Sequence, residues 1–135
     1  PVVIHNREST EDLCNILDEY AERLSGGVIH CFAGSPEFVE RACGWEFHIS
    51  FAGNVTFPKA EELRIAASEV PFERLLVETD APYLAPQAVR GKRCEPAYVK
   101  HTAEFLAQLL DMPYEEFSRT MTENASRLYD IPIDG

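Results

Sequence analysis

Short apolar runs alternate with amphipathic stretches along the chain. The runs begin near positions 1, 28, 47 and 75, and the last of them is Leu75-Leu76-Val77. Between the runs, apolar residues recur at every third or fourth position, which is the spacing of one helix face. Uninterrupted apolar runs are typical of strands that are buried on both faces of a parallel sheet. The alternation therefore predicts an α/β fold in which crossover helices join parallel strands.

Capping residues, prolines and glycines set the expected boundaries of these elements. Strands are predicted over 1–5, 28–32, 47–51 and 75–77. A first helix is expected to begin at Ser9 or Thr10 and to end before Gly26. A second, short helix is opened by Pro36 and closed by Gly44, and a third is predicted over 58–69.

The chain changes character after Asp80. The stretch 81–96 contains several prolines and the basic segment Arg90-Gly91-Lys92-Arg93. It is predicted to be a long loop, and long loops in compact domains are usually functional. Two further helices are opened by Pro96 and Pro113, and a final segment is expected to turn Ala125 and Leu128 inward. With no linker or low-complexity stretch, we expect a single α/β domain over residues 1–135.

Composition narrows the class of protein. A chain of 135 residues can bury a core, and 45% hydrophobic with 26% charged residues is ordinary for a soluble protein. No apolar run approaches the roughly 20 residues of a membrane span, and the start lacks the pattern of a signal peptide. The cysteines lack zinc-finger spacing, and because Cys14 and Cys43 fall in predicted helices and Cys31 in a predicted strand, we expect reduced thiols in a cytoplasmic protein. The lack of a long apolar run also predicts no membrane partner. A strand-like start without an initiator methionine suggests that the chain begins inside a larger fold.

The net charge restricts the partners of the chain. With a formal net charge of −11, the surface repels nucleic acid unless basic residues gather locally or metal ions offset the negative potential. This argues against a plain DNA-binding module. It leaves open a metal-dependent enzyme that acts on phosphate esters.

Two histidines and one aspartate end predicted strands of the same sheet. His5 and His30 close the first two strands, and Asp80 follows the fourth. The carboxyl ends of parallel strands open onto one face, so these residues should converge although they are far apart in sequence. Two neutral imidazoles and a carboxylate suit zinc, manganese or a related divalent ion, and Asp80 could also accept a proton from a bound water.

Other readings of these residues stay open. Glu78 and Asp80 would point the same way if the strand conformation continued to them, but they could equally begin a solvated loop. A histidine taken alone is more often structural than a metal ligand. His48 lies deeper in its strand and is expected to be packed or hydrogen-bonded, and His101 is expected on a helix surface.

The loop after Asp80 offers contacts for a substrate. Arg90 and Arg93 could supply forked donors to a phosphate backbone, or they could merely balance nearby acids. Tyr83 could stack on a base, or it could be a buried aromatic residue that anchors the loop. Arg7, two residues beyond His5, is equally ambiguous.

Six segments carry recognisable motifs in a fixed order: 3–7, 27–34, 47–53, 75–84, 90–99 and 122–128. The most specific are Glu78-Thr79-Asp80-Ala81-Pro82-Tyr83-Leu84 and Arg90-Gly91-Lys92-Arg93. Together they closely resemble the TatD family, metal-dependent deoxyribonucleases with an amidohydrolase-like (β/α)₈ barrel. Family members are usually cytoplasmic, use divalent metals such as zinc, magnesium or manganese, and trim DNA from 3′ ends, in the manner of a 3′-5′ exonuclease.

The resemblance also implies roles for individual residues. His5 and His30 would be metal ligands from the fifth and sixth barrel strands, and Asp80 would be the ligand and catalytic proton acceptor of the eighth. Glu78 would lie beside the site, supporting a ligand or lining the barrel. The loop from Arg90 to Arg93 would face the phosphate, with DNA as the expected substrate.

The chain also departs from the family pattern. Cys94 stands where the family usually has Asn, and Ala33 where it often has Ser, and both changes remove a polar contact. A (β/α)₈ barrel takes about 250 residues, and the first-strand His-x-His pair and fourth-strand Glu have no counterpart here. The fold class predicted is therefore the C-terminal half of a TIM-type barrel, strands 5 to 8 with crossover helices and extra C-terminal helices.

Half a barrel raises a physical difficulty. Four strands leave two unpaired edges and an uncovered interior face, and half of a ligand set should bind metal weakly. One hypothesis is thus a phosphodiester hydrolase impaired by truncation. The alternative is a non-catalytic half-barrel that needs a partner half, either a second copy or a separate N-terminal piece. A third reading, a small doubly wound domain that binds a phosphorylated ligand, predicts a glycine-rich turn where the chain has His5-Asn6-Arg7-Glu8.

Overall fold

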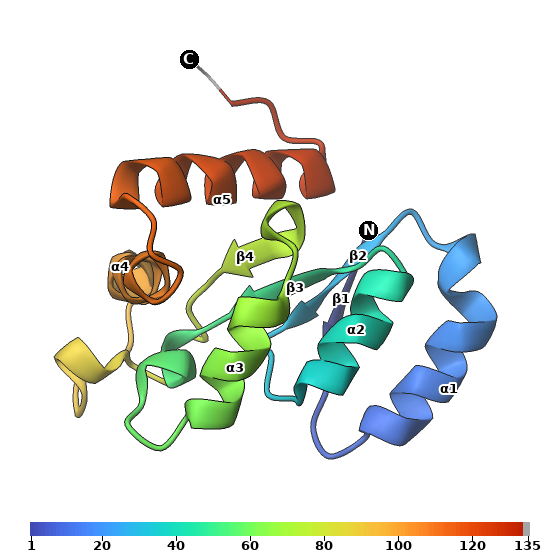
Figure 1. Cartoon of the computed structure of the whole chain (residues 1–135), viewed down its shortest axis with the longest axis horizontal. Coiled ribbons are helices and arrows are strands. Elements are labelled where there is room, and N and C mark those ends of the chain that lie inside the picture. The colour runs from blue at the N-terminus through green and yellow to red at the C-terminus, as the bar shows by residue number, and fades with distance from the viewer. Residues whose placement is uncertain (134–135) are drawn as a thin grey trace.

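The computed structural model describes residues 1–133 and contains one sheet of four parallel strands (Figure 1). The strands are β1 (Val2–His5), β2 (Gly27–His30), β3 (His48–Phe51) and β4 (Leu75–Val77). Neighbours in sequence are neighbours in the sheet, and His5 lies directly beside His30 in the register. Barrels have this sequential order, whereas doubly wound sheets reverse direction at a switch point. The predicted segment of a (β/α)₈ barrel is confirmed, and the doubly wound reading is excluded.

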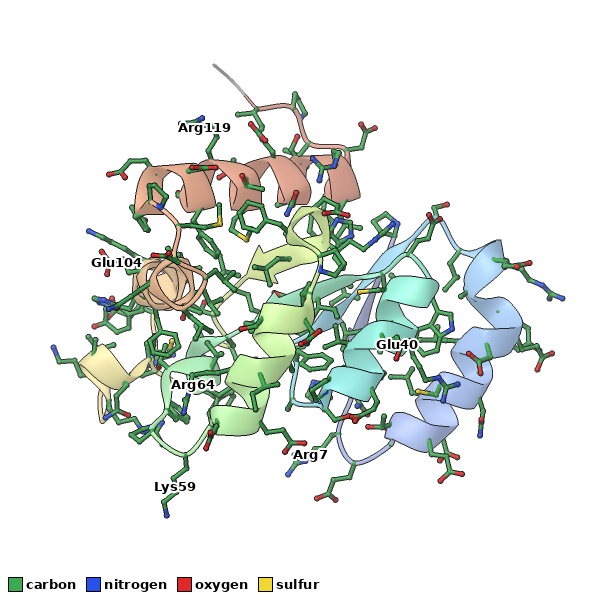
Figure 2. All side chains as sticks on the ribbon, viewed as in Figure 1. Arg7, Glu40, Lys59, Arg64, Glu104 and Arg119 are labelled. Carbon is green, nitrogen blue, oxygen red and sulfur yellow. The ribbon has the colours of Figure 1, made fainter. Side chains whose placement is uncertain are left out.

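Three helices cross over between successive strands, and two follow the last strand. They are α1 (Thr10–Tyr20), α2 (Pro36–Gly44), α3 (Glu61–Glu69), α4 (Val99–Leu109) and α5 (Tyr114–Tyr129). Figure 1 shows α1, α2 and α3 covering one face of the sheet, with α5 lying across the end of the molecule near the start of β4. The charged side chains of Glu40, Glu104 and Arg119 are exposed on the outer surfaces of α2, α4 and α5 (Figure 2). Within residues 1–133, no helix is long and apolar enough to cross a membrane.

Several element boundaries differ from those predicted. The second strand ends at His30 instead of residue 32, because Cys31 has a φ of 45° and turns the chain out of the sheet. The third helix begins at Glu61, after a turn at Pro58 and Lys59. The separate final segment expected near Ala125 is part of the continuous helix α5. These differences shift the ends of elements without altering their order.

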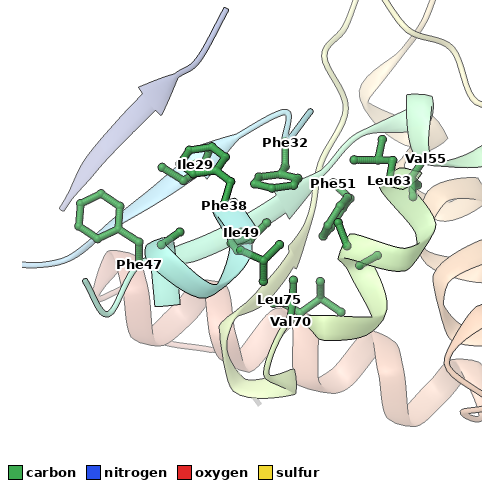
Figure 3. Packing of buried hydrophobic residues seen from close by; sticks show 14 of the residues in the cluster. Ile29, Phe32, Phe38, Phe47, Ile49, Phe51, Val55, Leu63, Val70 and Leu75 are labelled. Atoms are coloured by element: carbon green, nitrogen blue, oxygen red, sulfur yellow. The ribbon is translucent and has the colours of Figure 1, made fainter. Parts of the chain in front are cut away.

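The core lies between the sheet and the crossover helices. Ile29, Ile49, Phe51 and Leu75 point from the strands towards the helices and are no more than 1% exposed. Figure 3 shows them packed against side chains of α2, α3 and the preceding loops. The ring of Phe32 lies 5.4 Å from that of Phe38 and 5.5 Å from that of Phe51. Full burial of each such aromatic side chain stabilises the fold by about 1.5–3 kcal/mol.

The opposite face of the sheet, which carries His30, is more covered than expected. Val28, Ser50 and Leu76 on this face are at most 5% exposed, so the expectation of an uncovered interior is wrong at its centre. Side chains that point into a small barrel fill its interior, and neighbours on adjacent strands therefore shield one another. The face is open at β1, where Val3 is 60% exposed. The expected unpaired edges are present among the described strands, at β1 and at β4.

His48 is buried on the same face, as its depth in the strand predicted. Neither ring nitrogen has a well-formed hydrogen bond within residues 1–133. Burial lowers the pKa of His48, and the positive charges of Arg74 and Arg127 lower it further. Burial below the rim and the lowered pKa favour a neutral ring.

Asn124 fastens α5 to the start of β4. Its side chain is completely buried, and Nδ2 donates hydrogen bonds of 2.8 Å to the carbonyl oxygens of Phe72 and Leu75. In the parallel ladder, Leu76 bonds to β3, so the Leu75 carbonyl points towards the free edge. The Asn124 amide therefore satisfies a backbone group that no neighbouring strand reaches in this chain.

We predict that Asn124→Ala destabilises the fold by about 3 kcal/mol, because the buried Leu75 carbonyl and the part-buried Phe72 carbonyl each lose a donor. Urea denaturation followed by circular dichroism measures the change. Glu123→Ala, one residue earlier on the exposed side of α5, is the matched control and should change stability by less than about 0.5 kcal/mol. Equal effects of the two substitutions would contradict the role assigned to Asn124.

Candidate functional site: the carboxyl rim of the sheet

The carboxyl ends of the strands bring the predicted metal-binding residues together. His5 ends β1 and His30 ends β2, and because the two strands are in register their rings lie side by side. The ring centroids are 5.7 Å apart with an interplanar angle of 37°. The turn after His5 is held by Asn6, whose side chain donates to the hydroxyl of Thr10 and accepts the backbone N–H of Ser9.

Both acids that follow β4 approach the His30 ring. Oε1 of Glu78 lies 2.5 Å from Nδ1, and Oδ1 of Asp80 lies 3.6 Å from Nε2. The chain reaches this position because the backbone N–H of Glu78 donates to the Phe51 carbonyl of β3, one residue beyond the end of β4. The side chains of His30, Glu78 and Asp80 are 26%, 19% and 33% exposed. The three groups are therefore sheltered by the rim but open to solvent on one side.

The Glu78 contact bears on which nitrogen of a neutral His30 ring would carry the hydrogen. Oε1 of Glu78 is buried and has no hydrogen bond of good geometry within residues 1–133, so its 2.5 Å approach to Nδ1 is a close contact and not a formed hydrogen bond. In a neutral ring the approach favours the hydrogen on Nδ1, because an unprotonated nitrogen would place a lone pair against the carboxylate. Nε2 would then carry the lone pair, and it lies 3.6 Å from Oδ1 of Asp80. A carboxylate that holds the rear nitrogen of a metal-binding histidine has this effect in many metal sites.

The donor set suits a divalent cation but is incomplete. A separation of 3.6 Å between Nε2 and Oδ1 is what two ligands about 2.1 Å from one ion span at roughly 120°. His5 supplies a second imidazole from the adjacent strand. Across residues 1–133, however, no three His, Cys, Asp or Glu side chains surround a common point at ligand distance. The rim therefore holds a pair of well-placed donors and a third nearby.

Cys31 follows His30, and its φ of 45° turns the chain out of the strand. Burial raises the pKa of its thiol to about 12, and the negative charges of Asp80 and Glu78 contribute to the rise. The same charges attract a cation to the Nε2 side of His30.

The loop after Asp80 is fastened to the end of β3. The Thr56 hydroxyl donates to the Gly53 carbonyl at 2.6 Å and accepts the backbone N–H of Gln87 at 2.8 Å. Gly53 itself lies so close that a β-carbon would be 2.2 Å from the carbonyl oxygen of Leu84. Within the loop, the backbone N–H of Cys94 donates to the Pro82 carbonyl. These contacts fix the position of the loop relative to the carboxyl ends of the strands.

The predicted substrate-binding residues occupy different parts of the rim. Tyr83 is 69% exposed, so it is free to stack on a base and is not the buried anchor considered as an alternative. Arg7 is exposed in the turn after His5. Arg93 is exposed beside the Asp80 turn, next to the Cys94–Pro82 hydrogen bond. Arg90 lies earlier in the loop than Arg93, and its guanidinium carbon is 4.0 Å from the ring centroid of Phe57.

The roles of three residues in this region were not predicted from the sequence: Gly53, Thr56 and Phe57. A glycine directly after a strand signals a close approach of another segment, and that signal was available at Gly53. No local pattern points to Thr56 or Phe57, because their partners, Gln87 and Arg90, lie more than 30 residues later in the chain.

Comparison with known proteins identifies the family of the chain. A family model described as TatD related DNase matches residues 1–130. The chain is 47% identical over 131 residues to the uncharacterized metal-dependent hydrolase YabD of Bacillus subtilis, covering 97% of this chain and 51% of that protein. It is 35% identical over 136 residues to the human 3′-5′ RNA nuclease TATDN2, covering 97% of this chain and 18% of the relative.

A solved structure agrees with the fold. The crystal structure of YjjV, a TatD homologue from Escherichia coli K12, superposes with a TM-score of 0.89 at 28% identity. The match covers 98% of this chain and 51% of that one. The chain thus spans about half the length of YabD and of the YjjV structure that it matches.

We predict that Gly53→Ala displaces the loop and destabilises the protein by about 1–3 kcal/mol, since the new methyl group meets backbone atoms that cannot turn aside. Urea denaturation gives the size of the effect. Gly44→Ala is the matched control, because a β-carbon there, at the end of α2, meets nothing within 4 Å. Equal stability of the two variants would contradict the close approach at Gly53.

We also predict that Glu78→Gln redistributes the proton on neutral His30. Without the carboxylate, the tautomer protonated on Nε2 gains population, and affinity for zinc falls by about 10–100-fold. Long-range nitrogen–proton NMR spectra of the imidazole identify the tautomer directly. Glu95→Gln, exposed on the same loop, should leave the spectrum unchanged. An unaltered tautomer in Glu78→Gln would contradict the assignment.

Proposed function

The chain belongs to the TatD family, and from this membership we propose that its rim forms the C-terminal half of the active site of a metal-dependent phosphodiester hydrolase. The observation that supports the proposal most strongly is the placement of His30 between two acids. Oε1 of Glu78 lies 2.5 Å from Nδ1, and Oδ1 of Asp80 lies 3.6 Å from Nε2. His5, Asp80 and Nε2 of His30 would hold the cation. A bound divalent metal would polarise a phosphoryl oxygen and lower the pKa of a coordinated water.

Asp80 is the proposed proton acceptor. Its carboxylate is one-third exposed, so a water molecule can reach it from the open side of the rim. A carboxylate within hydrogen-bond reach of the attacking water can take its proton as attack on phosphorus begins. Glu78 is less exposed and turned to Nδ1 of His30, which makes it a positioning residue in this proposal.

The proposed substrate is a DNA strand that is shortened from its 3′ end. Arg7 and Arg93 flank the rim with exposed guanidinium groups that can contact phosphate oxygens. Tyr83 offers an exposed ring on which a terminal base can stack. The name of the human relative, a 3′-5′ RNA nuclease, makes RNA the competing substrate in any assay.

A second candidate is a half-barrel that acts only with a complementary half. Three described features favour it: β1 and β4 are free edges, Val3 is 60% exposed on the inner face, and three ligands do not meet around one point within residues 1–133. A complementary half would pair with both edges and complete the ligand set. In this case the chain alone binds metal weakly and has little nuclease activity.

One experiment tests both candidates. Release of nucleotides from labelled single-stranded DNA and RNA is followed with manganese or magnesium, for the chain alone and for the chain mixed with the half of YabD that lies outside the matched region. We expect little activity alone and activity in the mixture. Asp80→Asn should lower the activity of the mixture by about 10²–10⁴-fold, and the exposed Glu95→Gln should not.

Two results would contradict the proposal. Activity that survives Asp80→Asn would exclude the proposed proton acceptor. Tight, stoichiometric zinc binding by the chain alone, measured by calorimetry, would contradict the incomplete ligand set and the second candidate together.

A further inference from the structure

We propose that the complementary half is a second copy of this chain, and that two copies close into one eight-stranded barrel with two-fold symmetry. Each copy would pair the free edge of its β4 with the free edge of β1 in the other copy. The inference rests on the half-barrel candidate of the proposed function. It adds the identity of the partner and the two surfaces that join.

The sheet has the shape that such a closure needs. Its four parallel strands stand in sequential order, with β1 at one edge and β4 at the other. The chain superposes on half of the YjjV structure with a TM-score of 0.89, so its sheet has the curvature of half a barrel. An open edge leaves a row of backbone N–H and C=O groups unpaired, and closure into a barrel removes both edges.

The exposed surface of the chain is larger than its mass predicts. A folded monomer of 15.2 kDa is expected to expose about 7,100 Å². The chain exposes 8056 Å². The excess of about 900 Å² is close to the roughly 800 Å² that each partner contributes to an interface of standard size. The surface left open is therefore large enough for a stable dimer.

Apolar side chains border the free edge at β1. Asp18 of α1 forms an ion pair with Arg41 of α2, so this side of α1 faces the neighbouring helix. Ile16 and Tyr20 lie two residues to either side of Asp18, which at about 100° per residue places both on the opposite side of α1. They are 57% and 41% exposed, and Val3 of β1 is 60% exposed. The edge is thus flanked by exposed apolar side chains on the helix side and on the inner face.

An apolar groove of about 470 Å³ borders the other free edge. It is lined by Leu76 and Val77 of β4, and by side chains of α4, α5 and residues 131–133. Tyr129 and Ile131, which also line it, are 39% and 60% exposed. Figure 1 shows α1 and α4 on opposite sides of the molecule, so the flank at β1 and this groove do not meet within one copy. They are the two surfaces that a head-to-tail pairing would join.

Head-to-tail contacts form a closed ring or an open filament, depending on the rotation between copies. A sheet with the curvature of half a barrel turns through about half a circle, so the second copy closes the ring and leaves no edge for a third. The dimer repeats His5, His30 and Asp80 and adds no other kind of metal ligand. Little nuclease activity is therefore still expected from the chain alone.

Sedimentation equilibrium in EDTA, over a range of protein concentrations, tests this proposal without metal or substrate. Ile16→Lys alters the flank at β1, and Thr122→Arg alters the groove. Ile65→Lys is the control for the first, because this isoleucine of α3 is 50% exposed away from both edges. Thr120→Arg is the control for the second, because Thr120 lies outside the groove and, like Thr122, donates to the carbonyl oxygen four residues earlier. Circular dichroism confirms that each variant is folded.

We expect the wild type to have about twice the mass of one 15.2 kDa chain and to dissociate on dilution. Ile16→Lys and Thr122→Arg should each raise the dissociation constant by more than about 10-fold, and their controls by less than about 2-fold. Because each copy has a net charge of −11, added salt should tighten the dimer.

A mixture of Ile16→Lys and Thr122→Arg tests the head-to-tail arrangement. In a dimer of either variant alone, both junctions carry a substitution. In a mixed dimer, both substitutions fall at one junction, and the other junction is unaltered. The mixture should therefore associate more tightly than either variant alone.

Several results would overturn the proposal. These are the mass of a single chain at every soluble concentration, assemblies larger than two copies, equal effects of the substitutions and their controls, and no gain in the mixture. A dimer with the expected properties but no nuclease activity with the YabD half would instead refute only the proposed hydrolase. Nuclease activity of that mixture, with a chain that is monomeric by itself, would refute only this inference.

Discussion

The contact between Glu78 and Nδ1 of His30 is the interaction on which the proposed chemistry of this molecule depends. It joins the end of β2 to the chain beyond β4, across the intervening strand β3. The contact forms only if the parallel strands keep their register, because a shift by one residue would turn His30 to the opposite face. The apolar residues on the other face, among them Ile29 and Leu75, fix that register through their packing against the helices. The packing of the hydrophobic core thus fixes the position of the rim histidine between its two acids.

A second layer of organisation joins the loops to this frame. Gly53 and Thr56, directly after β3, hold the long loop that follows Asp80, and Arg64 of α3 holds the backbone at Phe57. β3, which contributes no proposed metal ligand, therefore positions the loop beside the proposed ligands. This division explains why the loop can be long and polar and still present exposed side chains such as Tyr83 in defined places.

Much of this arrangement could be predicted from the sequence. Apolar runs located the strands, and polar residues at their ends located the rim, because the position of a residue along a parallel strand also fixes the edge of the sheet that it reaches. The proximity of His30 to His5 and to Asp80 followed from that rule. The stack of Arg90 on Phe57 and the approach of Leu84 to Gly53 did not, since each joins loops whose paths depend on tertiary packing. The end of β2 was missed because Cys31 adopts a left-handed conformation that its side chain does not favour.

The central claim is that a divalent cation binds at this rim and not elsewhere on an acidic surface. Paramagnetic broadening of backbone amide resonances by a small amount of manganese tests it directly, even when binding is weak. The account predicts that broadening is strongest at His5, His30 and residues 78–81. Broadening that is equally strong at exposed acidic pairs, such as Glu11 and Asp12 of α1 or Glu115 and Glu116 of α5, would contradict it.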